Sequence, residues 1–80
     1  MGDVEMVREL ILVKASAKDV TKFIDEACNI EGVTDAYAVF GRFDAVVFIR
    51  GKDFDELKAV ARKVLAIRGI KHTETLPETD

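Results

Sequence analysis

Few residues of this chain can form covalent or metal cross-links. Its 80 residues include one cysteine, one histidine and no tryptophan. Because Cys28 is alone, no disulfide can form within the chain. Cys28 and His72 together cannot complete a structural zinc site, so no metal and no other cofactor is expected. Domains this small often need disulfides, metals or a partner chain, and we therefore expect self-association to stabilise this one.

Charge and hydropathy disfavour two further classes of protein. The chain has 12 Lys+Arg against 15 Asp+Glu, a formal net charge of -3, which disfavours direct binding to nucleic acid. No apolar run approaches the roughly 20 residues of a membrane span, and the acidic residues 1–5 do not resemble a secretory signal. We expect one cytoplasmic domain over residues 1–80, with a short loose tail at 77–80 and no membrane partner.

Two segments have apolar residues at helical spacing. The first follows Ser16, a candidate N-cap, and stops at Gly32; the second follows Asp53 and stops at Gly69. The remaining apolar or alternating segments predict strands over residues 6–14, 33–40, 43–50 and 70–76.

The two helical segments belong to an internal repeat. Ser16 and Gly32 are 16 positions apart, as are Asp53 and Gly69. Each repeat reads as strand, helix and strand, and two such units joined by a hairpin define the α+β, ferredoxin-like βαββαβ fold. Right-handed crossovers then predict a four-stranded antiparallel sheet in the order 4-1-3-2, with both helices on one face.

The two central strands of this sheet are apolar on both faces. Residues 10–13 of the first strand and 45–49 of the third are continuously apolar. One face packs against the helices, so the other presents an apolar patch of the kind that marks an interaction surface. A two-fold axis needs only one self-complementary surface, so we expect a dimer with face-to-face sheets, like a dimeric α/β barrel. The alternative is that long polar side chains of the edge strands cover the patch.

No motif of a catalytic centre is present. A Walker loop, a GxGxxG sequence and a nucleophile elbow are all missing from the sequence, so no catalytic residue is expected. Cys28 lies in the apolar stripe of the first helix and is expected to be buried and inert. His72 has no neighbouring ligand or base in sequence and is interpreted as a structural or surface residue.

The hairpin between the second and third strands has an unusual polar residue. Gly41-Arg42 fits a two-residue type II′ turn, and Asp44 then enters an otherwise apolar strand. Asp44 can bond nearby backbone N–H groups as turn residues do. Alternatively, it can recognise the ammonium of a small ligand whose carboxylate the hairpin backbone binds. The residues alone favour the first interpretation.

Several short motifs occur together along the chain. They are Ile30-Glu31-Gly32-Val33, Ala36-Tyr37-Ala38-Val39, Gly41-Arg42-Phe43-Asp44, Ile67-Arg68-Gly69-Ile70 and Thr73-Glu74-Thr75. In this combination, residues 7–76 resemble the effector-binding domain of the Lrp/AsnC (feast/famine) family of transcription regulators, also called the RAM or ligand-binding domain. Full-length members carry an N-terminal helix-turn-helix, which is not expected here because only about half a dozen residues precede the first strand.

The resemblance implies a function in binding and assembly. It implies sheet-to-sheet dimers, rings of dimers (octamers or decamers) and a free amino acid bound between dimers. It also implies that the chain modulates amino-acid-responsive transcription without its own DNA-binding domain, with full-length Lrp/AsnC regulators as further candidate partners and no direct contact with nucleic acid. The ligand-binding residues that it implies lie in the hairpin and the last strand: Gly41, Arg42, Phe43, Asp44, Thr73 and Thr75.

Two other functions remain open at this point. Some small dimeric ferredoxin-like proteins are monooxygenases or isomerases, which generally need a cavity with His, Tyr, Asn or Trp groups. Here His72 and Tyr37 are the single residues of their types. The other alternative is a ligand-free structural partner that co-assembles with full-length regulators. The related ACT domain shares the topology, but its motifs fit less well.

Overall fold

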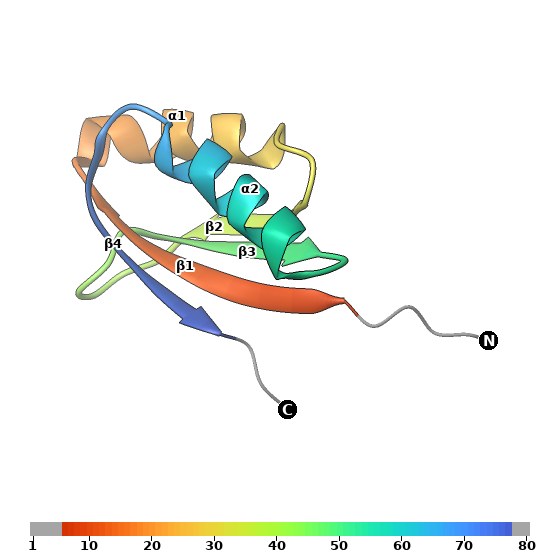
Figure 1. Ribbon diagram of the computed structural model, residues 1–80. Helices are drawn as coiled ribbons and strands as arrows, with labels where there is room; N and C mark the ends of the chain where they lie inside the picture. The colour runs from red at the N-terminus through yellow and green to blue at the C-terminus, as the bar shows by residue number, and fades with distance from the viewer. Residues whose placement is uncertain (1–5, 78–80) are drawn as a thin grey trace.

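The computed structural model describes residues 6–77 and has the predicted order of elements (Figure 1). The elements are β1 (Val7–Ala15), α1 (Ala17–Cys28), β2 (Val33–Ala38), β3 (Ala45–Gly51), α2 (Phe54–Leu65) and β4 (Ile70–Pro77). The tail was predicted from residue 77, but Pro77 is the last residue of β4, and residues 78–80 lie outside the described part. No helix of the described chain is long and apolar enough to span a bilayer.

The sheet has the predicted strand order. Its strands lie in the order β2-β3-β1-β4, and all neighbours are antiparallel. Figure 1 shows both helices on one face of this sheet. At one end of the pairing between β1 and β4, Glu9 lies opposite Pro77, so β4 ends beside the first half of β1.

The core lies between the helices and one face of the two central strands. Successive strand residues point to opposite faces, and the fully buried residues of β1 and β3 alternate as this requires. The large buried side chains are Ile11, Val13, Val47 and Ile49 from the sheet and Phe23, Leu57 and Val64 from the helices. Burial of these side chains stabilises the fold by about 1.5–3 kcal/mol each relative to full exposure.

Cys28 is exposed, so the prediction of a buried thiol is wrong. The residue before it, Ala27, is fully buried, and Phe23 lies one turn earlier on the same side. Successive helical residues are about 100° apart around the axis, so Cys28 falls beside the stripe that faces the sheet. It is also the last residue of α1, where the helix runs into its C-cap.

The two predicted N-caps differ in their bonds. The Asp53 carboxylate accepts from the backbone N–H of Glu56 (2.9 Å), and the Glu56 carboxylate accepts from the N–H of Lys52 (2.6 Å). This is close to the reciprocal bonding of a capping box. Ser16 occupies the N-cap position of α1 but its oxygen accepts no capping bond from the helix backbone; its hydroxyl donates to the Asp19 carboxylate (2.6 Å).

The two helix-to-strand joints are equivalent, as the repeat predicts. Gly32 and Gly69 have φ angles of 102° and 96°, where glycine is strongly favoured. A Cβ atom on Gly32 would overlap Val60 of α2, and one on Gly69 would lie 2.9 Å from Cβ of Asp19 at the start of α1. Each joint therefore packs closely against the helix of the other repeat.

The connection between β2 and β3 is longer than the predicted two-residue turn. Regular pairing ends at Ala38 and Ala45, and the last backbone bond of the hairpin runs from the N–H of Val39 to the carbonyl of Asp44 (3.0 Å). The reason is that the N–H of Asp44 donates to the Val13 carbonyl of β1 (2.8 Å) and not to β2. Gly41, with φ 120°, lies in the loop that results.

Candidate functional site

The predicted ligand-binding hairpin is attached to the C-terminal end of β1 through Asp44. Its carboxylate accepts a hydrogen bond from the backbone N–H of Ala15 (2.9 Å). Pairing of β1 with β3 ends at Val13, so this N–H has no ladder carbonyl opposite it, and the carboxylate takes that place. Asp44 therefore does bond a backbone N–H, as the turn interpretation proposed, although its partner is 29 residues away in sequence.

The hairpin has a second attachment to the same strand. The Lys14 ammonium donates to the backbone carbonyl of Arg42 (2.9 Å), which places a positive charge beside the loop. A Cβ atom on Gly41 would have no neighbour within 4 Å, and the side chain of Phe40 is fully exposed. The loop is thus fixed at its base and open at its tip.

The two predicted threonines lie across β1 from the hairpin. Thr73 pairs with Val13 and Thr75 with Ile11, so both are on the helix-facing side of the edge strand β4. Asp44 bonds to Val13 from the opposite side of β1. Two strand spacings therefore separate Thr73 from the hairpin, roughly 10 Å. The six predicted residues gather at one end of the sheet, but one chain does not close them around a cavity.

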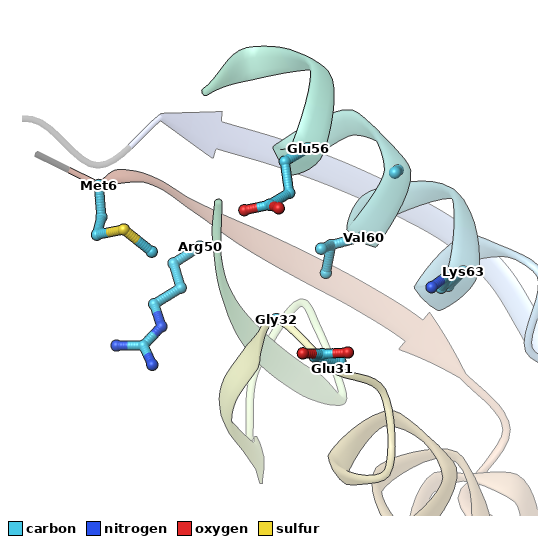
Figure 2. Close-up of a pocket in the computed structure, with 8 residues that line it drawn as sticks. Met6, Glu31, Gly32, Arg50, Glu56, Val60 and Lys63 are labelled. Carbon is cyan, nitrogen blue, oxygen red and sulfur yellow. The ribbon is translucent and has the colours of Figure 1, made fainter. Parts of the chain in front are cut away.

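Three clefts of the described surface are lined by other residues. One of them, of about 440 Å³, lies between α2 and the joint that precedes β2 (Figure 2). Its ionisable side chains are Glu31, Arg50, Glu56 and Lys63. Glu56 is occupied in capping α2. Figure 2 shows Arg50 directed away from Glu56 and Glu31, so the cleft has no convergent set of groups.

The sheet face opposite the helices is apolar in its centre, as predicted, and we call it the open face. Leu10, Leu12, Val46 and Phe48 form its central rows, with Leu12 opposite Val46 and Leu10 opposite Phe48. Tyr37 packs edge-on against Phe48, with ring centroids 6.0 Å apart. These side chains are buried or half-buried in the single chain, except Tyr37, which is exposed.

The polar pair at the edge of the open face was not singled out from the sequence. The Tyr37 hydroxyl donates to the Asp35 carboxylate. This hydrogen bond, with a smaller contribution from desolvation and from the charge of Asp35, raises the pKa of Tyr37 above its usual value. The sequence contained a sign of this pair, because Asp35 and Tyr37 are two residues apart on one strand and such residues share a face.

Taken together, the βαββαβ order, the strand order and the two helices on one face define a small ferredoxin-like domain. Residues 9–77 match the Lrp/AsnC ligand binding domain. The chain therefore belongs to the Lrp/AsnC ligand-binding-domain family, as the sequence motifs predicted.

Solved structures agree with this assignment. The protein TTHA0845 from Thermus thermophilus is 27% identical with a TM-score of 0.83, covering 92% of this chain and 94% of that one. E. coli AsnC is 28% identical with a TM-score of 0.82, and the match covers 92% of this chain but 51% of AsnC. The transcriptional regulator NMB0573 of Neisseria meningitidis, in complex with L-Met, is 18% identical with a TM-score of 0.76, covering 92% of this chain and 50% of that one. No curated protein matches the chain closely in sequence.

Proposed function

We propose that this domain binds a free amino acid and, through its assembly state, modulates amino-acid-responsive transcription in the cytoplasm. The observation that carries the proposal is the family match over residues 9–77, which identifies a regulatory ligand-binding module. The complex of NMB0573 with L-Met supports an amino acid as the class of effector. The net charge of -3 supports a role in which this domain does not itself bind DNA.

The hairpin supports this proposal by its chemistry. An α-amino acid presents one ammonium and one carboxylate, so its site needs an acceptor and several donors. Asp44 is the acceptor: one of its oxygens accepts from Ala15, and no other donor among residues 6–77 bonds to its carboxylate. Loop N–H groups around Gly41, with hydroxyls from Thr73 or Thr75, are the proposed donors.

Assembly is part of the same proposal. One chain leaves the hairpin open and the threonines about 10 Å away from it, which supports a pocket that a second copy closes. We propose a sheet-to-sheet homodimer that further assembles into an octameric or decameric ring, with the amino acid between dimers. Full-length Lrp/AsnC regulators are candidate partners of such rings.

We propose that the domain is not an enzyme. The single histidine lies on β4 and the single tyrosine on β2, the two opposite edges of the sheet. Three strand spacings separate these edges, roughly 14 Å, so His72 and Tyr37 of one chain cannot act on one substrate atom. This arrangement disfavours the monooxygenase or isomerase alternative.

The proposal is tested by a thermal-shift screen of the twenty amino acids, with light scattering of the assembly in parallel. A ligand at a hundred times its Kd stabilises the native state by about 2.7 kcal/mol, which is a shift of roughly 10–20 °C for a domain of this size. We expect a shift with a few amino acids and a change in assembly with the same ones. If none binds at millimolar concentration, the domain is a structural partner without an effector.

A further inference from the structure

We propose that the open face carries a second amino-acid position, formed by Arg8, Arg50 and Asp35 at the end of the sheet remote from the hairpin. This inference rests on the proposed function, because it takes the same class of ligand. A cleft of about 380 Å³ opens there. It is lined by Arg8, Thr34, Asp35, Tyr37, Phe48, Ile49 and Arg50.

The two arginines are direct neighbours on adjacent strands. Arg8 of β1 is the register partner of Arg50 of β3. The N–H of Arg50 donates to the Gly32 carbonyl (2.8 Å), on the side away from β1. Arg8 and Arg50 are therefore a non-hydrogen-bonded pair, the type in which Cα atoms are about 4.5 Å apart and side chains are closest.

This pair of positive charges is not neutralised within the described chain. Like charges directly opposite each other destabilise an antiparallel pair. The one contact within ion-pair distance among residues 6–77 joins Nε2 of His72 to a carboxylate oxygen of Glu74 (3.8 Å), on the far edge strand. Arg50 points away from Glu31 and Glu56 (Figure 2). A carboxylate bound between two guanidinium groups would remove the repulsion and form charge-assisted, bidentate hydrogen bonds.

Asp35 supplies the complementary charge for an ammonium group. It lines the same cleft as the arginines and pairs with Phe48, two residues from Arg50 on the same face of β3. Its carboxylate accepts from the Tyr37 hydroxyl, which orients it and leaves lone pairs for a further donor. Phe48 and Tyr37, packed edge to face, offer an apolar wall to the side chain of the bound amino acid.

The position is compatible with the proposed dimer. The apolar rows around Leu12 and Phe48 occupy the middle of the open face, where a two-fold axis buries the most apolar area. The arginine pair lies two residues beyond the pair of Leu10 and Phe48, at the end of the face. An amino acid bound there lies at the rim of a sheet-to-sheet contact.

The test compares Arg50→Gln, Asp35→Asn and Asp44→Asn with the natural protein by titration calorimetry against each of the twenty amino acids. Arg62→Gln, an exposed α2 arginine that lines neither cleft, is the matched control. We expect Arg50→Gln and Asp35→Asn to weaken one class of site by about ten- to a hundredfold while Asp44→Asn and Arg62→Gln leave that class intact. Carboxamide derivatives of the amino acids that bind should be insensitive to Arg50→Gln, and N-acetyl derivatives to Asp35→Asn.

Three outcomes overturn the inference. If Asp44→Asn abolishes all binding while Arg50→Gln and Asp35→Asn change nothing, the second position does not exist and the proposed function stands. If Arg62→Gln weakens binding as much as Arg50→Gln, the effect is one of general charge. If no amino acid binds the natural protein, this inference and the amino-acid function fail together.

Discussion

Asp44 combines two roles that its two side-chain oxygens allow. One oxygen replaces a missing ladder carbonyl for the N–H of Ala15, and the proposed function uses the carboxylate's remaining capacity to accept from an ammonium. The position was conspicuous in the sequence because an acid preceded five apolar residues. Its bond to β1 was not predictable, because the register of β1 against β3 cannot be read from one segment alone.

Substitutions of Asp44 separate these roles. Asp44→Asn keeps an acceptor for Ala15 but removes the negative charge, so amino-acid binding should weaken about ten- to a hundredfold with little change in stability. Asp44→Ala also leaves the N–H of Ala15 unpaired and should lower the free energy of unfolding by about 1–3 kcal/mol. Calorimetry and urea unfolding measure the two effects, and equal binding by Asp44→Asn would contradict the assignment.

Tyr37 is a spectroscopic probe of the open face, because it is the single tyrosine of the chain. Its hydrogen bond to Asp35 raises its pKa, so absorbance at high pH should show ionisation above the ordinary tyrosine value of about 10. The folded protein binds the Tyr37 proton more tightly than the unfolded chain does. The resulting stabilisation of the fold is complete at pH values below the ordinary pKa and is lost as the pH rises through the raised pKa. In Asp35→Asn the titration should return toward the ordinary value, and an unchanged titration would show that Asp35 is not the cause.

At the scale of elements, the joint from α1 to β2 is closely constrained by its neighbours. Gly32 combines a positive φ angle with close contact to Val60, whereas Gly41 has a positive φ angle in open space. Both glycines were singled out in the sequence, one as a helix stop and one as a turn residue. Their different surroundings depend on how α2 packs, which no local pattern contains.

Alanine substitutions at these glycines should therefore differ in cost. Gly41→Ala introduces backbone strain alone, about 1–2 kcal/mol. Gly32→Ala adds an overlap with Val60, so we expect a clearly larger loss of unfolding free energy. Denaturant unfolding of the two variants measures the difference. Similar losses would mean that α2 shifts to make room at little cost.

The elements were largely predictable and the details of their ends were not. The helical stripes and the two-sided apolar strands specified the order and layers of the fold, because burial follows periodicity. The hairpin was predicted too short because Asp44 bonds to β1, a partner distant in sequence. The exposure of Cys28 was missed because it sits at the margin of its stripe, on the last residue of α1. The Arg8–Arg50 pair depends on register, which the sequence does not reveal.

For the whole molecule, the open face is the surface on which the proposed dimer depends. Its centre is a continuous apolar area across β1 and β3, with Tyr37 packed beside it. The predicted dimer places a second copy over this area. The alternative, in which edge side chains cover the patch within one chain, predicts a soluble monomer.

Leu12→Asp distinguishes these alternatives. Leu12 lies in the central rows, so a charge there would be desolvated in a dimer at a cost of several kcal/mol. We expect a shift toward monomer in sedimentation velocity at micromolar concentration. Leu65→Asp places the same charge on an exposed position of α2 and should leave the assembly unchanged. A natural protein that sediments as a monomer would disprove the dimer.

The pairing of Glu9 with Pro77 has a consequence for the chain's connectivity. Pro77 lies one strand spacing, about 4.8 Å, from Glu9, and Met6 is only three residues before Glu9, so a short linker could join β4 to β1. If the chain were then opened at the exposed Gly41, its new order would be β3, α2, β4, β1, α1 and β2. Renumbered from its new start, this circular permutant is again βαββαβ with strand order 4-1-3-2. The topology is thus unchanged when its two halves exchange places, as expected of a domain built from one unit used twice.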